Sequence, residues 1–144
     1  MKTDKKKQTN NIPDCTIFFL AKAYQKGHSL IQKRLRPYGL TNMQHLVLEG
    51  LWYEEGQTAS DLGRLLVLDK ATLSGILDRM SEGGWIEKKQ DNCDRRVYRL
   101  HPSQKAKEFQ LSLIKERQLA NEELLAGFSV EEKILLKRML WDLI

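Results

Sequence analysis

Cysteine, histidine and proline are scarce in this chain of 144 residues, and long apolar stretches are missing from it. The two cysteines, Cys15 and Cys93, are too few for a disulfide framework and fit a reducing compartment. No apolar stretch approaches the roughly 18–20 residues of a membrane span. The polar, lysine-rich residues 1–11 lack the apolar segment of a secretion signal. We therefore expect a cytoplasmic protein that has no membrane partner.

Motifs of catalysis and metal binding are also missing. The chain contains no phosphate-binding glycine loop, no Gly-x-Ser-x-Gly and no His-Glu-x-x-His. Its three histidines, His28, His45 and His101, have no metal-ligand spacing among themselves or with the cysteines. Asp91 and Asp94 lie in one short turn, and turn formation explains them better than a catalytic pair does. We expect no enzymatic activity, no metal and no cofactor.

The composition is that of an ordinary soluble domain, with 41% hydrophobic and 30% charged residues. A chain of this length buries roughly 68–70% of its surface on folding, so one core needs no disulfides. The formal net charge of +5 permits a nucleic-acid partner without proving it. A basic cluster in residues 88–99 interrupts a region of balanced charge. A solvated turn is the alternative interpretation of this cluster.

Helix starts and ends are easy to recognise. Three segments, Thr41–Gln44, Thr58–Asp61 and Ser129–Glu132, have the form of capping boxes, and Asp69 is a fourth N-cap candidate. Apolar residues recur with helical spacing between these starts and the glycines that follow. The helices are expected over residues 14–36, 42–54, the short segment from 58, 69–82, 102–126 and 129–144.

The composition of residues 85–100 differs from that of the helical segments and predicts a two-stranded hairpin. Segments 85–90 and 95–100 are short and richer in aromatic and β-branched residues, and the turn-forming residues 91–94 separate them. The expected fold class is therefore mainly α, with six helices and a two-stranded wing. A short helix, a tight turn, a second helix and a basic hairpin in this order outline a winged helix-turn-helix.

The helix over 69–82 has the two faces that a DNA-reading helix needs. Its apolar side is formed by Leu73, Ile76, Leu77 and Met80, which neighbouring helices would cover. Lys70, Thr72, Ser74 and Gly75 lie off that side and lack bulk, so the helix can approach base edges in a major groove about 12 Å wide. Arg79 can reach phosphates. Ordinary helix surface is the alternative interpretation of the hydroxyl residues.

Residues 58–102 resemble the DNA-binding half of the multiple-antibiotic-resistance regulator (MarR) family. The matching segments are Asp61-Leu62-Gly63-Arg64-Leu65-Leu66, Asp69-Lys70-Ala71-Thr72-Leu73-Ser74, Leu77-Asp78-Arg79-Met80, Gly84-Trp85-Ile86-Glu87 and Asp94-Arg95-Arg96. The Asp-x-Arg of the wing is the most specific of them, and Gly39-Leu40-Thr41-x-x-Gln44 extends the likeness upstream. Leu100-His101-Pro102-Ser103-Gln104 departs from the Leu-Thr-Pro-x-Gly that the family commonly has after the wing.

The resemblance implies a homodimer that binds a pseudo-palindromic DNA operator, usually as a repressor. It divides the chain into a disordered basic tail over residues 1–12, a dimerisation helix over 13–40, a winged helix-turn-helix over 41–101 and C-terminal dimerisation helices over 102–144. The apolar residues of the last two helices support a homodimer, since a monomer would leave them exposed. The two reading helices would then lie roughly 34–36 Å apart, one DNA turn.

DNA contacts are expected from the two helices and the wing. In the family the wing arginine, here Arg96, enters the minor groove, and the aspartate, here Asp94, holds the wing through basic neighbours. Arg79 is the natural partner for Asp94. The expected DNA-binding residues are Thr58, Ser60, Lys70, Ala71, Thr72, Ser74, Arg79, Asn92, Asp94, Arg95 and Arg96.

A small-molecule effector is the least defined expectation. Members of the family often bind aromatic or phenolic acids between the dimer helices and the DNA-binding part. Tyr24, His28, His45 and Trp52 are the candidates here, and Tyr24 and His28 are four residues apart on one helix face. We expect a flat aromatic acid or its coenzyme A thioester to act as the effector. Core residues of an interface are the alternative interpretation.

Two other functions remain open on the sequence. Peroxide-sensing members of the family carry a reactive cysteine near the start of the first helix, which is where Cys15 lies. Those members have a tyrosine where this chain has Asn42, and Cys93 has acidic neighbours that disfavour a thiolate. A helical protein-interaction module that does not bind DNA would share the same fold.

Overall fold

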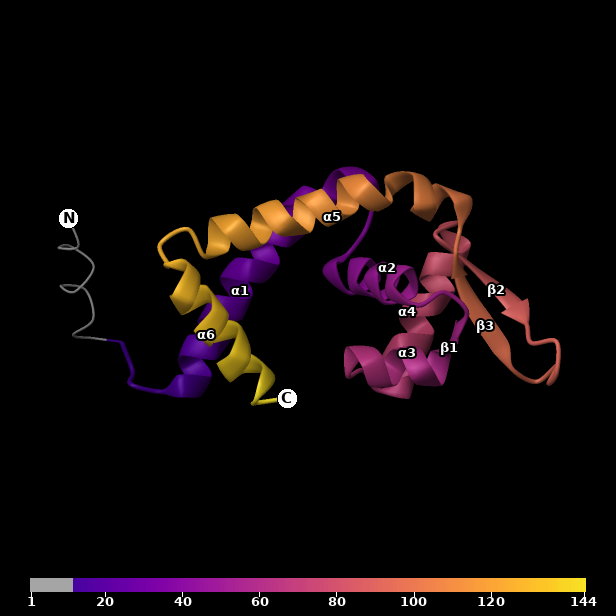
Figure 1. Cartoon of the computed structure of the whole chain (residues 1–144), viewed down its shortest axis with the longest axis horizontal. Helices are drawn as coiled ribbons and strands as arrows, with labels where there is room; N and C mark the ends of the chain where they lie inside the picture. Colours follow the sequence, from indigo (N-terminus) through magenta and orange to yellow (C-terminus); the bar gives the residue numbers. More distant parts are fainter. Residues whose placement is uncertain (1–11) are drawn as a thin grey trace.

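The computed structural model describes residues 12–144, and in this part of the chain six α-helices alternate with a small sheet (Figure 1). The expected mainly α class is confirmed, while all but one residue of the expected basic tail, 1–12, lies outside the described residues. The elements are α1 Thr16–Leu35, the 3-10 helix η2 Arg36–Tyr38, α2 Asn42–Tyr53, β1 Gln57–Thr58, α3 Ala59–Leu66, α4 Lys70–Glu82, β2 Ile86–Gln90, β3 Tyr98–Pro102, α5 Gln104–Leu124 and α6 Val130–Trp141. No helix in this part is long and apolar enough to cross a membrane.

The local start signals of the helices are confirmed. Thr41, Thr58 and Ser129 each form a complete capping box, in which the hydroxyl accepts the N3 amide and the N3 side chain accepts the N-cap amide. Asp69 caps α4 by accepting the backbone N–H of Thr72 at 2.9 Å. The start expected at Pro102 is wrong by two residues, because Pro102 ends β3 and Ser103 is the N-cap of α5.

The sheet has three antiparallel strands in the order β1-β3-β2, so the expected two-stranded wing is incomplete. Strand β1 holds only two residues and pairs Gln57 with Leu100 and Thr58 with Arg99. Two residues are too short to show an alternating pattern in a sequence, which is why this strand was not expected. The pairing of β2 with β3 runs from Ile86↔Pro102 to Gln90↔Tyr98, leaving residues 91–97 as the wing loop.

Two helices form an arm that connects the ends of the molecule (Figure 1). Helices α1 and α5 pack against each other, and Arg34 of α1 bonds Glu116 and Glu123 of α5 at 3.3 and 3.1 Å. Helices α2, α3 and α4 pack together with the sheet at one end of this arm. We call this part the winged lobe, residues 41–102. The core runs from the C-terminal part of α1 through the lobe into α5, and its fully buried members include Leu35, Leu48, Leu51, Leu62, Met80 and Leu113.

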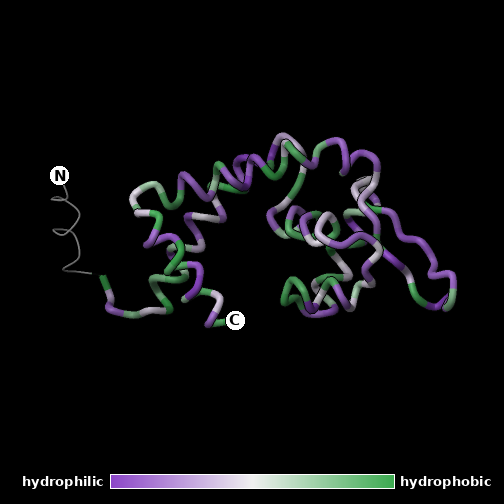
Figure 2. Tube along the Cα trace, viewed as in Figure 1, coloured by the Kyte–Doolittle hydropathy of each residue, from purple (hydrophilic) through white to green (hydrophobic). Residues whose placement is uncertain are grey.

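The other end of the molecule leaves apolar side chains uncovered. Helix α6 contains no buried residue, and apolar residues recur along it and along the start of α1 (Figure 2). Of the helical stripe over 14–36, only Ile31 and Leu35 are buried. The exposed large apolar residues of α1 and of the chain from Phe128 on are Ile17, Phe19, Leu20, Tyr24, Phe128, Val130, Ile134, Leu135, Met139, Leu140, Trp141, Leu143 and Ile144. A contiguous apolar end of this kind marks an interaction surface.

Candidate nucleic-acid interface

Helix α4 has the two faces that its sequence predicts. Leu73, Ile76, Leu77 and Met80 are buried and pack against α2 and α3. The residues of α4 that are expected to face DNA are all exposed, namely Lys70, Ala71, Thr72, Ser74 and Arg79. The apolar side therefore holds the helix in place, while its polar side is open to a ligand.

The turn before α4 is held by Asp69. Its carboxylate accepts the backbone N–H of Thr72 at 2.9 Å and the hydroxyl of Thr72 at 2.6 Å. These bonds favour the charged carboxylate, so the pKa of Asp69 lies below its usual value, with the Thr72 hydroxyl as the main cause. Because its proton is used in this bond, the Thr72 hydroxyl presents oxygen lone pairs to any partner on the exposed side.

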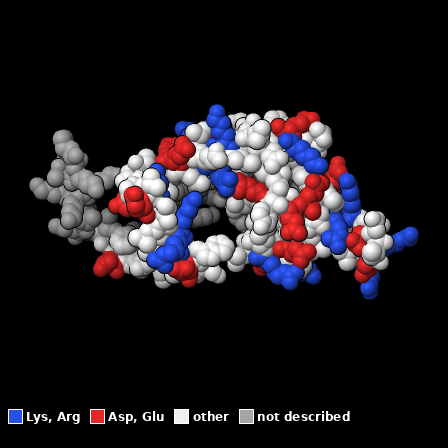
Figure 3. Space-filling model, in the orientation of Figure 1, with Lys and Arg blue, Asp and Glu red and all other residues white. Residues whose placement is uncertain are grey.

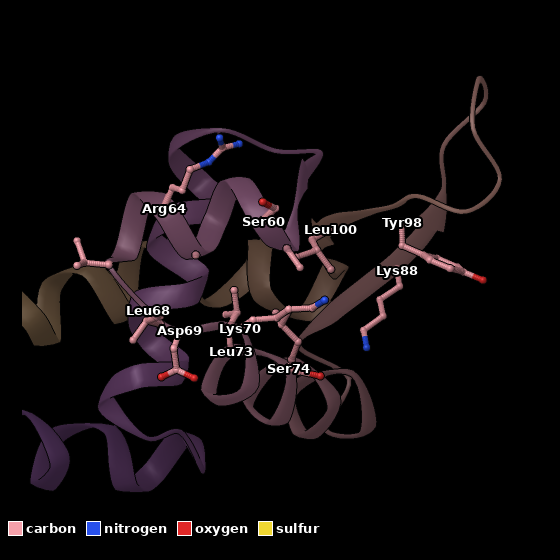
Figure 4. Close-up of a pocket in the computed structure, with 14 residues that line it drawn as sticks. Ser60, Arg64, Leu68, Asp69, Lys70, Leu73, Ser74, Lys88, Tyr98 and Leu100 are labelled. Carbon is pink, nitrogen blue, oxygen red and sulfur yellow. The ribbon is translucent and has the colours of Figure 1, made fainter.

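Helix α3 starts with two hydroxyl residues of different roles. The hydroxyl of Thr58 donates to Asp61 at 2.8 Å and accepts the Asp61 amide at 3.2 Å, so Thr58 serves mainly as a cap. Ser60 is exposed in the first turn. Its side chain lines the hollow between α3, α4 and the sheet (Figure 4). Ser60 is therefore free to contact a partner there, whereas Thr58 is committed within the chain.

The wing loop presents its basic residues to solvent. Asn92, Arg95 and Arg96 are exposed, and the Arg96 side chain is 90% exposed although it bonds Asp94. Its Nε and Nη2 donate to the two oxygens of Asp94 at 3.1 and 3.2 Å, and its backbone N–H donates at 3.0 Å. These bonds place the pKa of Asp94 below its usual value. The Arg96 side chain is thus oriented by bonds within the chain itself.

The expected pairing of Asp94 with Arg79 is wrong. The turn brings Arg96 against Asp94 from only two residues away, and a partner this close costs little chain entropy. Within residues 12–144, Arg79 takes part in no ion pair. Its guanidinium therefore remains available at the end of α4.

A hollow of about 850 Å³ lies between α3, α4 and the sheet (Figure 4). Leu73, Leu77 and Leu100 are among its apolar lining, and Lys70 and Lys88 bring positive charge. Lys88 also bonds Asp78 at 2.7 Å. Blue side chains project at the wing-bearing end of the molecule, with red ones beside them (Figure 3). This concave, partly basic surface separates the exposed face of α4 from the wing.

The expected effector residues form two separate pairs. The rings of Tyr24 and His28 lie 5.6 Å apart on α1, where Tyr24 is 61% exposed. The rings of His45 and Trp52 lie 6.2 Å apart on α2, where His45 is fully buried. None of the four lines the hollow beside α4.

A buried polar cluster at the junction of α2 with α5 was missing from the sequence-based expectations. His45 Nε2 lies 3.1 Å from the carbonyl oxygen of Leu113, so this nitrogen carries the proton and Nδ1 faces Glu49 Oε1 at 3.6 Å. Arg117 Nε lies 2.7 Å from the same Glu49 oxygen, although its N–H direction completes no hydrogen bond. The spacing of His45 and Glu49 on one helix could have indicated their contact, whereas nothing local points to Arg117.

Burial determines the charge states in this cluster. It lowers the pKa of His45 to about 4, and the nearby charge of Arg117 acts in the same direction against the Leu113 carbonyl. Burial also raises the pKa of Glu49, which Arg117 counteracts. His45 is therefore neutral near pH 7. Two side chains of the winged lobe, His45 and Glu49, thus meet Arg117 of α5 through a contact whose charges are only partly compensated.

The remaining candidates do not come together as a reactive centre. Cys15 is the exposed N-cap of α1, and Cys93 is exposed in the wing loop. Both are free thiols. Among residues 12–144, no three His, Cys, Asp or Glu side chains are grouped as metal ligands would be. The arrangement that stands out is therefore the capped helix α4, the hollow beside it and the basic wing.

Comparison with known proteins agrees with this arrangement. The sequence profile described as "MarR family" matches residues 40–98. The chain is 34% identical over 80 residues to the HTH-type transcriptional regulator TtmR of Methylorubrum extorquens, a match that covers 56% of this chain and 40% of that protein. The chain thus matches less than half the length of this relative.

Solved structures match the whole fold. A probable transcriptional regulator from Pseudomonas aeruginosa superposes with a TM-score of 0.86 at 27% identity, covering 91% of this chain and 98% of the other. A MarR variant from E. coli in complex with operator DNA superposes with a TM-score of 0.81 at 22% identity, covering 88% and 91%. The fold and the lobe are those of a winged helix-turn-helix protein. Residues 40–98 of the chain are similar to the MarR family.

The buried His45 predicts a pH dependence of stability. The unfolded imidazole binds a proton near pH 6.5, whereas the folded one binds it only near pH 4. The unfolded chain therefore holds more protons between these values, and the free energy of unfolding falls as the pH falls through this window. Between pH 7 and pH 5 this group costs about 2 kcal/mol.

Replacing His45 by Gln removes the titration and keeps a donor for the Leu113 carbonyl. We expect H45Q to lose about 2 kcal/mol less than the wild type between pH 7 and pH 5, measured by urea unfolding at equal protein concentration. Glu49, with its raised pKa, changes stability in the opposite direction, and both proteins retain it. Equal pH dependence of the two proteins would contradict a buried, neutral imidazole.

Proposed function

We propose that this chain is a sequence-specific DNA-binding transcription regulator that acts as a homodimeric repressor and releases DNA when it binds a small effector. The observation that carries the proposal is the exposed polar face of α4, ordered by its Asp69 cap and standing beside a pre-oriented basic wing. A protein-interaction module would need neither short polar side chains on α4 nor an arginine held at the wing. Similarity to the MarR family over residues 40–98 and a fold shared with a structure solved on operator DNA support the proposal.

Helix α4 would supply the contacts that read base sequence. Its exposed Thr72 and Ser74 are short enough for the helix to enter the major groove. Lys70 and Arg79 flank them and would neutralise phosphates, and the Ser60 hydroxyl would donate a hydrogen bond to a phosphate oxygen. The hollow between α4 and the sheet is a concave surface over which the sugar–phosphate strand between two grooves would pass. Arg96, and beside it Arg95, would enter the adjacent minor groove, where narrow A·T-rich sequence concentrates negative potential.

A second copy of the chain would cover the exposed apolar end. Helix α6 has no buried residue, and Trp141, Leu143 and Ile144 are 74%, 67% and 80% exposed. An isologous pairing through α1 and α6 would bury these side chains twice over. The two copies of α4 would then face successive turns of one duplex, so a pseudo-palindromic operator is expected.

The effector would be a flat aromatic acid or its coenzyme A thioester. The adjacent rings of Tyr24 and His28 offer an aromatic surface with a polar end on the exposed side of α1. His45 and Trp52 lie where the winged lobe meets α5, so a ligand in contact with both pairs would change the position of the lobe relative to the arm. Dimers whose α4 helices change their separation lose one of two half-sites.

Removing the wing arginine tests the DNA-binding proposal. Arg96→Ala should weaken operator binding by about 1–3 kcal/mol, roughly 5- to 150-fold, because its minor-groove contact is lost. Affinity is measured over a salt titration on a duplex selected from random DNA, and the wild type should show a linear fall of log affinity with log salt. Lys133→Gln on α6 is the control for loss of one positive charge and should bind normally. Unchanged affinity of Arg96→Ala removes Arg96 from the interface.

A polar substitution on α6 tests the dimer. Ile134 is 65% exposed in the single chain, so Ile134→Lys leaves the core intact but would bury a charge in the dimer interface. Sedimentation should show two chains for the wild type and a shift towards one chain for Ile134→Lys at micromolar concentration. Lys137→Glu, at an exposed polar position of the same helix, is the matched control. A wild-type mass of one chain would contradict the proposed assembly.

A ligand screen tests the effector. Aromatic acids and acyl thioesters are added to the protein, and a true effector should raise its unfolding temperature by about 5 °C at saturating concentration and also release the duplex. Tyr24→Ala and His28→Ala should abolish both effects while leaving DNA binding intact. A screen in which no compound does both would leave the effector proposal without support. Release by peroxide that Cys15→Ser abolishes would assign the response to the thiol instead.

A further inference from the structure

One carboxylate organises the wing tip. Asp91 Oδ2 accepts the backbone N–H groups of Cys93 and Asp94 at 3.0 and 3.1 Å. The backbone N–H of Asp91 itself donates to the carbonyl of Val97 at 2.9 Å and closes the loop. Its side chain is only 16% exposed, whereas Arg96 at the same tip is 90% exposed. The turn therefore depends on Asp91 more than on the residues that would touch DNA.

Arg99 connects this carboxylate to the base of the lobe. Its Nε donates to Asp91 Oδ1 at 2.5 Å, and its Nη1 donates to the carbonyl of Gly56 at 2.9 Å. Gly56 precedes β1, and Thr58 at the end of β1 caps α3. Arg99 is also the β3 residue that pairs with Thr58 across the sheet. A continuous path of bonds thus runs from the wing tip to the start of α3.

We propose that Asp91 and Arg99 are positioning residues, which together hold the wing at a fixed distance from α4 so that Arg96 and the reading helix can engage the same duplex. We call this pair the wing strap. The proposal rests on the proposed DNA binding and adds two residues to it, since neither was expected to contact DNA. A bidentate guanidinium suits the role, because its planar fork joins two acceptors in one geometry.

The strap is distinct from the expected contact residues by its chemistry. Arg99 joins two separate groups, Asp91 and the Gly56 carbonyl, which β1 connects to α3, whereas Arg96 bonds only Asp94 and is far more exposed. Asp91 is negatively charged, and the bond from Arg99 is the main cause that holds its pKa below the usual value. A carboxylate near phosphates opposes DNA binding by simple charge repulsion. Its presence in a DNA-facing loop is therefore explained by the order that it imposes.

Electrostatics and positioning therefore predict opposite effects on DNA affinity when the charge of Asp91 is removed. Asp91→Asn keeps an oxygen for the amides of the turn, but it removes the charge-assisted bond to Arg99. By electrostatics alone the loss of a negative charge should strengthen binding to DNA, whereas loss of positioning should weaken it. We expect D91N to bind the selected duplex about five- to tenfold more weakly at constant salt. Glu87→Gln removes a negative charge from β2 of the same wing and is the matched control, which should bind as tightly as the wild type or more tightly.

Substitution of Arg99, the partner of Asp91, gives a second experiment. Arg99→Gln should weaken binding as much as D91N, and the double variant should be no weaker than either single one, because both cut the same strap. Arg99→Lys keeps the charge and a donor, so it should restore part of the affinity. Unfolding free energy and dimer mass, measured for each variant, separate this effect from loss of the fold.

Hydrogen exchange in the free protein makes the strap testable without DNA. The amide of Asp91 and those of Cys93, Asp94 and Val97 should exchange faster in D91N and R99Q, while those of α4 keep their wild-type rates. Unchanged wing exchange overturns the strap, even if the wild type binds no duplex and the proposed function fails. Faster exchange with D91N affinity equal to or above wild type overturns the positioning role alone.

Discussion

The structure depends on the burial of one side of α4. Four apolar side chains, Leu73, Ile76, Leu77 and Met80, are held between α2 and α3, and they fix which side of the helix faces outward. Burial of four such side chains contributes on the order of 6–12 kcal/mol before entropy is counted, far more than any single polar contact at the surface. The polar residues of the exposed face need no specific contact to be presented. They follow from the spacing of the buried ones, and Asp69 adds the start point of the helix.

A less favourable interaction connects the lobe to the arm. Buried atoms of four side chains, His45, Glu49, Trp52 and Arg117, lack hydrogen-bond partners within the described chain. Unsatisfied groups of this kind cost free energy, and a uniformly apolar junction would hold α2 and α5 together more firmly. A junction that is only partly satisfied can be rearranged at small cost, which is compatible with the movement of the lobe relative to the arm that the proposed effector response requires. The core of the lobe has the opposite property, since its contacts are apolar and close-packed.

Local chemistry made most of the fold predictable. The caps at Thr41, Thr58, Asp69 and Ser129 use residues within three positions of one another, so the sequence alone contains the whole interaction. The contacts that were missed join distant segments. Strand β1 exists only because β3 lies beside it, and Arg117 reaches Glu49 only because α5 crosses α2. The expected pairing of Asp94 with Arg79 is wrong for the converse reason. Arg96, only two positions away, bonds Asp94 in place of the residue on α4.

The three arginines of the wing show how identical side chains acquire different roles from their surroundings. Arg99 bonds two acceptors within the chain, and Arg96 is oriented by one carboxylate but exposed. Arg95 is exposed, and its carbonyl accepts a bond from Gln90. From the sequence, a basic cluster shows only its total charge and not the surroundings of each arginine. Arg96 and Arg99 each donate two side-chain hydrogen bonds within the chain, but Arg99 joins two separate groups and is 46% exposed, whereas Arg96 bonds only Asp94 and is 90% exposed. The proposed difference in role, positioning for Arg99 and recognition for Arg96, therefore follows from what each guanidinium joins and from how far it is exposed.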